Sequence, residues 1–129
     1  MAKTALELTR QEWQAYRPGA TGQQLGRKPD PGLHLRRQQA WRVARKAAKV
    51  LREQYGAERV VLFGSLAHRG RFTAWSDIDL AAWGVPAECF YLAVAAVTAL
   101  SPAFKVDLVD PETCRPLLLQ VIEREGVEL

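Results

Sequence analysis

Three aspartates in the second half of the chain have the residue type and the spacing needed to hold divalent cations. Asp77 and Asp79 stand two positions apart in residues 76–83, where polar and apolar residues alternate at the start and therefore predict a strand. Residues i and i+2 of a strand point to the same face, so the two carboxylates stand side by side. A like-charged pair is costly unless a cation lies between its members, and a hard divalent ion with oxygen ligands is the usual solution. The alternative interpretation is a polar strand edge that faces solvent.

The third aspartate, Asp107, stands among apolar neighbours in residues 104–109, which predict another strand. Its carboxylate is therefore expected to be buried, and a buried Asp without a partner is costly and rare. If this strand neighbours the one that carries Asp77 and Asp79, the three acids could hold two metal ions, an arrangement that serves in-line phosphoryl or nucleotidyl displacement. Asp110 stands an odd number of positions after Asp107, so it would point to the opposite face of the strand, and we expect it to start a turn.

The dipeptide Gly64-Ser65 follows directly on residues 59–63, an apolar and β-branched run that predicts a buried central strand. A glycine there lets backbone amides approach a ligand closely, and the serine caps the next turn and presents a hydroxyl and an amide to an anion such as phosphate. The same dipeptide also fits a plain tight turn. Arg69 and Arg71, in the loop that follows, and Lys105 are placed either to contact phosphate or to be solvated.

The remaining periodicities predict the elements that position these residues. Residues 33–55 predict a helix in which apolar side chains recur at steps of three and four, and Gly56 ends it. Residues 87–100 predict an Ala- and Val-rich helix, apolar on every side, that is buried all round or partly meets a partner. Residues 115–125 predict a final helix closed by Gly126. The order of helix, strand, strand, helix, strand, helix predicts an α/β (α+β) fold, with a small sheet covered by helices.

Basic residues are concentrated in the first half of the chain. Residues 1–58 hold 12 Lys and Arg against 5 Asp and Glu, whereas residues 59–129 hold 6 against 9, and the formal net charge is +4. The polar faces of the helix predicted at 33–55 carry most of this excess: Arg36, Arg37, Arg42, Arg45, Lys46, Lys49 and Arg52. This pattern predicts either a solvated helix face or a surface for RNA or an acidic partner.

Residues 1–32 predict an N-terminal arm, in which a short helix is followed by a Gly- and Pro-rich linker, and residues 33–129 form the folded domain. Glu7 and Arg10 stand where a secretory signal would have its apolar core, so we expect the protein to stay in the cytoplasm. The longest apolar stretch, residues 90–100, is shorter than the ~20 residues that a membrane span needs, so no membrane partner is expected.

Further interpretations concern isolated residues. His34 and His68 have no metal-ligand spacing around them and are expected on the surface. Trp75 and Phe72 are expected to pack under their loop, or alternatively to stack on a base. Cys89 and Cys114 form no Cys-x-x-Cys pattern and are expected to be small buried hydrophobes.

Together these motifs resemble the minimal nucleotidyltransferases of the DNA polymerase beta superfamily. The likeness rests on Gly64-Ser65, on Asp77-Ile78-Asp79-Leu80 and on Val106-Asp107-Leu108-Val109, and it covers roughly residues 38–129. It implies a small mixed sheet of the palm type found in that family. The usual turn of the family reads Gly-Ser-x-Ala-Arg-Gly, whereas here His68 precedes Arg69.

The resemblance also implies a role for each matched residue. The triphosphate of an incoming nucleotide would be bound by Gly64, Ser65 and Arg69. Two Mg²⁺ ions would be bound by Asp77, Asp79 and Asp107. Asp107 would in addition help to activate the acceptor hydroxyl. The implied reaction transfers a nucleoside monophosphate, AMP from ATP above all, to a hydroxyl and releases pyrophosphate.

The same resemblance implies a partner. Similar minimal chains often act as antitoxins, paired with a helical HEPN-type toxin that they bind and adenylylate on tyrosine, so a protein acceptor in a hetero-oligomer is expected. Two alternatives stay open. One is a binding module that neutralises its partner by contact without catalysis, and the other is transfer to an RNA end held by the basic helix at 33–55.

Overall fold

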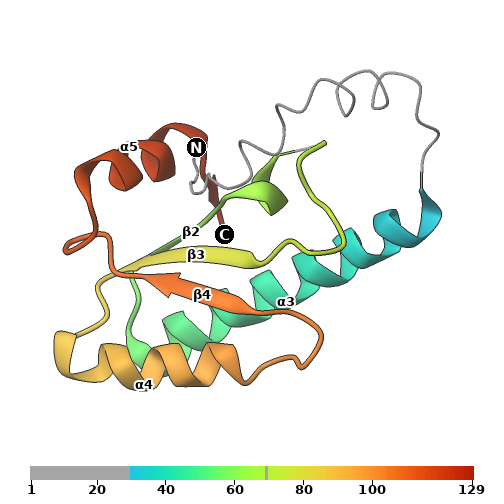
Figure 1. Cartoon of the computed structure of the whole chain (residues 1–129). Coiled ribbons are helices and arrows are strands. Elements are labelled where there is room, and N and C mark those ends of the chain that lie inside the picture. The colour runs from blue at the N-terminus through green and yellow to red at the C-terminus, as the bar shows by residue number, and fades with distance from the viewer. Residues whose placement is uncertain (1–29, 69) are drawn as a thin grey trace. The chain divides into compact units, whose positions relative to one another are not determined.

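A mixed four-stranded sheet lies at the centre of the computed structural model, which describes residues 30–68 and 70–129 (Figure 1). The strand order is β4-β3-β2-β5, where β2 is Arg59–Phe63, β3 is Ile78–Trp83, β4 is Val106–Val109 and β5 is Val127–Glu128. β2 pairs antiparallel with β3 and β5, and β3 pairs parallel with β4. The α+β fold and the first three strands are confirmed, although β3 and β4 each begin two residues later than predicted. β5 was not predicted.

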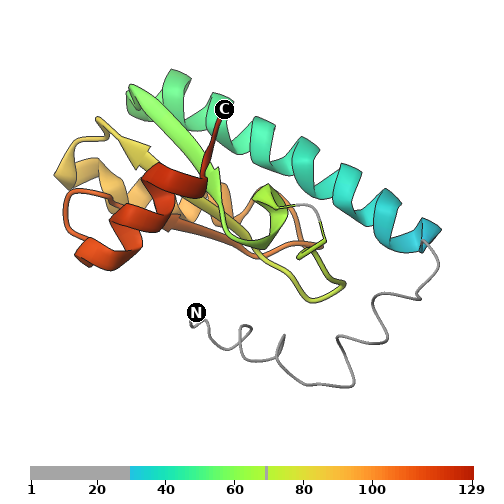
Figure 2. The ribbon, with the colours of Figure 1, turned by 90° about the horizontal axis from the view of Figure 1, so that it is seen from above.

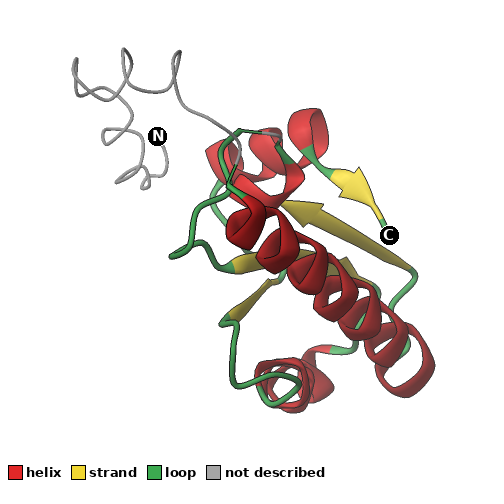
Figure 3. Ribbon diagram, turned by 90° about the vertical axis from the view of Figure 1, so that its right-hand side faces the viewer, coloured by secondary structure: helices red, strands yellow, loops and turns green. Residues whose placement is uncertain are grey.

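Helices cover both faces of this sheet. α3 (Pro31–Tyr55) and α4 (Ala87–Thr98) lie on one face, and α5 (Pro116–Glu125) lies on the other (Figures 1 and 2). Figure 3 shows the strands as the layer between them. Among the described residues one further short element follows β2, the 3₁₀ turn η1 (Ser65–Ala67). All three predicted helices that fall in this part of the chain are therefore present, whereas the arm predicted at residues 1–32 lies outside the described residues up to position 29.

Small residues allow α3 to lie close to the sheet. Its buried positions are four alanines and a leucine, spaced at helical intervals: Ala40, Ala44, Ala47, Ala48 and Leu51. The helix begins at Pro31, two residues earlier than expected, because a proline is well tolerated in the first turn, where its missing N–H has no intrahelical partner. Gly56, with φ +75°, ends it in the left-handed conformation that a C-terminal glycine favours.

α4 corrects the expectation of a helix buried all round. Only Ala93 and Val97 are buried in it, while the side chains of Tyr91 and Leu92 are 81% and 57% exposed. The physical reason is position, because α4 packs against α3 and the edge strand β4 and has no neighbour on its outer side among the described residues. No helix in the described ranges combines the length and the apolar character that crossing a bilayer requires.

The alternating side chains of β3 divide between two cores. Ile78, Leu80 and Ala82 point to the α3 and α4 side and belong to the larger apolar cluster. Ala81 points the other way and packs with Val61, Phe63 and Ile122, the last of which comes from α5. α5 thus covers the middle of the second sheet face.

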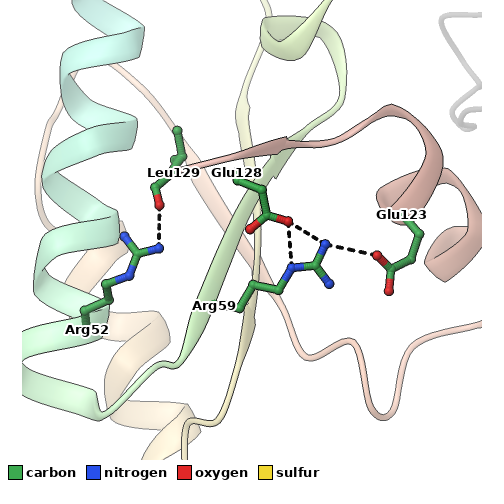
Figure 4. Close-up of polar contacts among 5 residues, drawn as sticks. All are labelled: Arg52, Arg59, Glu123, Glu128 and Leu129. Carbon is green, nitrogen blue, oxygen red and sulfur yellow. Dashed lines mark hydrogen bonds and ion pairs between the residues drawn. The ribbon is translucent and has the colours of Figure 1, made fainter.

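β5 is joined to the sheet by charged side chains as well as by its backbone (Figure 4). Arg59 donates from Nε to Glu128 Oε2 at 2.7 Å, and its Nη2 lies 3.1 Å from Glu123 Oε1. The hydrogen bonds to Glu128 and Glu123 raise the pKa of the Arg59 guanidinium above its usual range, and the same bond lowers the pKa of Glu128. The Arg59 guanidinium also lies 4.3 Å from the centre of the Trp83 ring. Arg52 of α3 donates to the carbonyl oxygen of Leu129.

Candidate functional site

The sheet places Asp79 and Asp107 next to each other. They are register partners in the parallel pair β3–β4, so their side chains leave the same face of the sheet, the face that α5 covers further along. Asp77 lies just before β3, two positions from Asp79. The two strands are therefore neighbours, which was the condition for the three acids to share one site.

Asp107 is not buried, which corrects the sequence-based expectation. Its side chain is 42% exposed, and Lys105 Nζ lies 3.7 Å from Asp107 Oδ1. β4 is an edge strand, and the apolar partners of α5 on this face reach Val109 but not the start of the strand. A carboxylate in an apolar sequence can therefore remain solvated, because alternation shows which face it takes but not what covers that face.

The Gly64 backbone lies directly against the Asp79 carboxylate. A β-carbon placed at Gly64 would lie 2.3 Å from Asp79 Oδ2, and the residue has φ +79°. Glycine is thus required here twice, by the left-handed backbone and by the close approach of the side chain. This contact links the end of β2 to the acidic positions at the start of β3.

The turn that follows Gly64 is held by several short contacts. The amides of Ala67 and His68 donate to the carbonyls of Gly64 and Ser65 at 3.1 and 3.2 Å. Leu66 is fully buried beneath the turn, and its carbonyl accepts a hydrogen bond from Arg37 Nη2 of α3 at 3.3 Å. Gly64, rather than the serine, takes the N-cap position of η1, and no side chain caps it, so the expected Ser65 cap is absent.

His68 has an acidic partner that sequence analysis did not find. His68 Nε2 lies 2.9 Å from Glu125 Oε1, and Arg71 Nη1 lies 3.8 Å from the same oxygen. Both His68 and Glu125 are partly buried, with side chains 29% and 28% exposed. His68 was expected on the surface and is instead partly buried, and nothing in the local spacing pointed to an acid 57 positions away.

The loop between η1 and β3 presents an indole to solvent. Trp75 is 89% exposed, whereas Phe72 is buried, so the expectation that Trp75 packs under its loop is wrong. Thr73 holds the loop, because its amide donates to Ser76 Oγ at 2.9 Å and its hydroxyl accepts from the Trp75 amide at 3.1 Å. Arg69 lies outside the described residues, and its assignment to phosphate stays a prediction.

The two cysteines are only partly buried, which corrects the expectation of small core residues. Burial raises the pKa of the Cys114 thiol above its usual value, with a further contribution from the nearby Asp110. Asp110 starts a turn as predicted, since its Oδ1 accepts from the Glu112 amide at 2.9 Å.

Several members of the basic set on α3 serve the fold. Arg36 Nη2 donates to the Ala103 carbonyl at 3.1 Å, and its guanidinium lies 4.2 Å from the centre of the Phe104 ring. Arg37 holds η1 as described above. Exposed basic side chains remain at Arg42, Arg45, Lys46 and Lys49, so a surface for RNA or an acidic partner stays a prediction.

The acidic positions offer the right donor chemistry for a hard divalent cation, because carboxylate oxygens are the ligands that Mg²⁺ prefers. Asp77 directly precedes β3 and Asp79 lies within it, and the glycine at position 64 leaves the space that the Asp79 carboxylate needs. Within residues 30–68 and 70–129, however, no three His, Cys, Asp or Glu side chains come close enough together to hold one ion. The assignment of Asp77, Asp79 and Asp107 to two metal ions therefore stays a prediction.

Comparison with protein families decides the classification. The model of the family "Polymerase beta, Nucleotidyltransferase" matches residues 45–129, which include β2 with its glycine turn, both acidic strands and α5. The chain belongs to this family. The nucleotidyltransferase domain has no match among curated protein sequences.

Solved structures similar to this nucleotidyltransferase agree in fold. One is designated a minimal nucleotidyltransferase; it is 31% identical with a TM-score of 0.55, and the match covers 70% of this chain and 94% of that one. Another is a toxin–antitoxin complex with AMP-PNP, 25% identical with a TM-score of 0.55, covering 66% of this chain and 70% of that one. A third is the MNT antitoxin in complex with the tri-AMPylated HEPN toxin of Shewanella oneidensis, 22% identical with a TM-score of 0.52, covering 69% and 70%. The last shows the shared fold alone.

Proposed function

We propose that this nucleotidyltransferase transfers AMP from ATP, with Mg²⁺, to a hydroxyl group of a protein and that it serves as the antitoxin of a HEPN-type toxin. The observation that carries the proposal is the contact of Gly64 with the Asp79 carboxylate, in a chain whose family is that of the polymerase beta nucleotidyltransferases. This contact brings the turn that begins at Gly64 next to Asp79, and the proposal assigns the triphosphate to the turn and the metal to the acidic residues.

The chemistry assigned to the site is an in-line displacement at the α-phosphorus. The acceptor oxygen forms a bond to phosphorus, the bond from phosphorus to the bridging oxygen breaks, and pyrophosphate leaves. Gly64 and Ser65, with Arg69, hold the triphosphate, and Asp107 accepts the proton of the acceptor hydroxyl. Asp77, Asp79 and Asp107 would hold two Mg²⁺ ions, which would supply neutralisation of the charge that develops on the phosphate oxygens. The protein contributes positioning and fixed charge in this mechanism.

The protein acceptor is inferred from the structural neighbours. The toxin–antitoxin complex at 25% identity was solved with AMP-PNP, an ATP analogue, and the more distant complex contains a HEPN toxin that carries AMP groups. This small domain offers little surface with which to bind a small acceptor. A macromolecular acceptor that contributes its own binding surface therefore fits best. The exposed apolar residues of α4, Tyr91 and Leu92, support association with another protein.

The same exposed residues favour the second candidate, a module that neutralises its partner by contact alone. Under that alternative the acidic residues are present but unused. The two candidates differ in one respect that is easy to measure, because only the first requires the carboxylates of Asp77 and Asp79.

The test is transfer of label from α-labelled ATP, with Mg²⁺, into host lysate resolved by size. We expect label in one protein band with the wild-type chain and none with Asp79→Ala, while Glu53→Gln, which removes an exposed carboxylate of α3, retains full transfer. Label that nuclease removes would instead indicate an RNA acceptor. If the folded protein transfers label from none of the four nucleotides and still neutralises its partner, the proposed transferase activity is wrong. Neutralisation by contact then remains as the explanation.

A further inference from the structure

The turn of residues 64–68 is held at both ends by a carboxylate. At its start Gly64 lies against the side chain of Asp79, and at its end His68 lies against that of Glu125. The first carboxylate belongs to the proposed metal site. The second comes from the end of α5, on a segment that the proposed chemistry does not use.

Glu125 is placed to hold more than one group of the loop. Its Oε1 lies 2.9 Å from His68 Nε2 and 3.8 Å from Arg71 Nη1, while Oε2 lies 3.6 Å from Arg124 Nη2 on its own helix. Its side chain is only 28% exposed, so these interactions are screened less than those of a solvated surface pair. The strongest of these contacts, by distance, is the one with His68.

The position of Glu125 follows from the residue that comes next. Gly126 passes so close to β2 that a β-carbon on it would lie 2.2 Å from Val61 Cγ1 and 2.5 Å from the Ile122 carbonyl oxygen. The end of α5 is therefore pressed against the middle of β2, the strand that leads into the turn. This close approach brings Glu125, the residue before Gly126, within reach of His68 at the end of the same turn.

We propose that Glu125 is a positioning residue for the nucleotide: through His68 it fixes the end of the 64–68 turn and so sets where the turn meets the triphosphate. This inference rests on the proposed function, since it assigns the nucleotide to that turn. Glu125 touches no reacting atom in this scheme. It acts on the turn at His68, while Asp79 limits the turn at Gly64, so loss of the Glu125 contact lets the turn shift relative to the acidic residues.

A measurement of nucleotide binding tests this role without requiring catalysis or an acceptor. The probe is α,β-methylene ATP with Mg²⁺, titrated by calorimetry into the full chain. We expect Glu125→Ala to weaken its Kd by about tenfold, the effect of losing one hydrogen bond to a charged group, and Glu125→Gln to weaken it less because the amide oxygen still accepts a hydrogen bond. In the transfer assay the same variants raise the KM for ATP more than they lower kcat.

A matched control separates positioning from general stability. Glu123→Gln removes another α5 carboxylate, one that pairs with Arg59 rather than with the turn, and is expected to lower the Tm slightly without changing the Kd. His68→Ala removes the same contact from the turn. The double variant of His68→Ala and Glu125→Ala should bind the analogue about as weakly as the weaker of the two single variants, because each substitution removes the same interaction.

The outcomes distinguish the inference from the function on which it depends. If the wild-type chain binds the analogue and the Glu125 and His68 variants bind it equally tightly, the positioning role is wrong and the proposed function stands. The positioning role is also wrong if Glu123→Gln weakens the Kd as much as the Glu125 variants do at the same loss of Tm. A general loss of stability would then explain the weaker binding. A wild-type chain that binds no analogue overturns both.

Discussion

Asp79 and Asp107 are register partners across the parallel strands β3 and β4, yet their surroundings differ. The carboxylate of Asp79 lies against the Gly64 backbone, whereas that of Asp107 is 42% exposed and lies 3.7 Å from Lys105 Nζ. The Asp79 carboxylate is thus enclosed by the fold on one side, whereas the Asp107 carboxylate is more open to solvent. The two are expected to respond differently to substitution.

Replacement of Asp107 by Asn should separate activity from stability. Nucleotidyl transfer should fall by about a hundredfold or more, as when one preorganised group is removed from an active site. The free energy of unfolding should change by less than about 0.5 kcal/mol, because an exposed ion pair contributes little. Label transfer and urea denaturation measure the two quantities. Lys105→Gln breaks the same ion pair, so a matching loss of stability without loss of transfer is the expected control result.

Gly64→Ala should abolish transfer and destabilise the domain by more than the left-handed backbone alone can explain. The added β-carbon would lie 2.3 Å from Asp79 Oδ2, so the carboxylate or the turn must move. Gly56→Ala is the matched control, since Gly56 has a similar φ of +75° and nothing within 4 Å of the added atom. That control should cost only about 1–2 kcal/mol and leave transfer intact. Equal losses of stability in the two variants would contradict the contact.

Gly126→Ala should destabilise the domain although its φ of −74° is suitable for alanine. Its β-carbon would lie 2.2 Å from Val61 Cγ1, and overpacking of this kind typically costs about 1–3 kcal/mol. Thermal or urea unfolding measures the loss. Adding Val61→Ala should recover only part of it, because the Ile122 carbonyl oxygen at 2.5 Å remains in the way. A double variant that is no more stable than additivity predicts would show that the two positions are not in contact.

The ion pair of Arg59 and Glu128 should give a pH-dependent contribution to stability. The hydrogen bond from Arg59 lowers the pKa of Glu128, so its contribution is complete above the ordinary pKa of a glutamate and is lost as the pH falls through the lowered value. Glu128→Gln should therefore be less stable than the wild type at pH 7, by no more than about 1 kcal/mol for so exposed a pair, and equally stable near pH 2. Thermal melts across this range provide the measurement. For the control Glu53→Gln, the difference in stability from the wild type should not shrink as the pH falls. If the difference between Glu128→Gln and the wild type is the same at every pH, the ion pair is not its cause.

Arg36→Lys should destabilise the domain although the charge is kept. Arg36 lies over the Phe104 ring at 4.2 Å and donates to the Ala103 carbonyl, and a lysine ammonium reproduces neither the planar stacking nor the fork of donors. We expect a loss of about 1 kcal/mol in the free energy of unfolding, measured with urea. Arg42→Lys, at an exposed position of the same helix, should stay within about 0.5 kcal/mol of the wild type. If both substitutions have the same effect, the stacking on Phe104 contributes nothing.

Hydrophobic periodicity was sufficient to predict the main elements. The stripe of small apolar residues on α3, the β-branched run of β2 and the alternation at the start of β3 each specify one type of structure, and the described part of the chain adopts it. The neighbouring of Asp79 and Asp107 was stated only as a condition for a metal site, because the pattern of one strand does not show which strand lies beside it. Their metal-binding and catalytic roles stay predictions.

What sequence analysis missed depends on contacts between distant positions. β5 consists of two residues, too few for any period to be visible, and it exists because Gly126 allows the chain to return along β2. The pairing of His68 with Glu125 likewise has no local pattern. The exposure of Asp107 and of Trp75 was predicted wrongly for a related reason, since periodicity identifies a face but not whether another element covers it.

The two edges of the sheet limit the ways in which another chain can attach to it. One edge is the two-residue β5, which carries Glu128 paired to Arg59, and the other is the four-residue β4, with Lys105 just before it and Asp107 within it. Short strands with charged side chains are poor templates for an added strand. A partner is therefore expected to bind across helix faces instead of extending the sheet, and the domain is protected from self-association through β-augmentation.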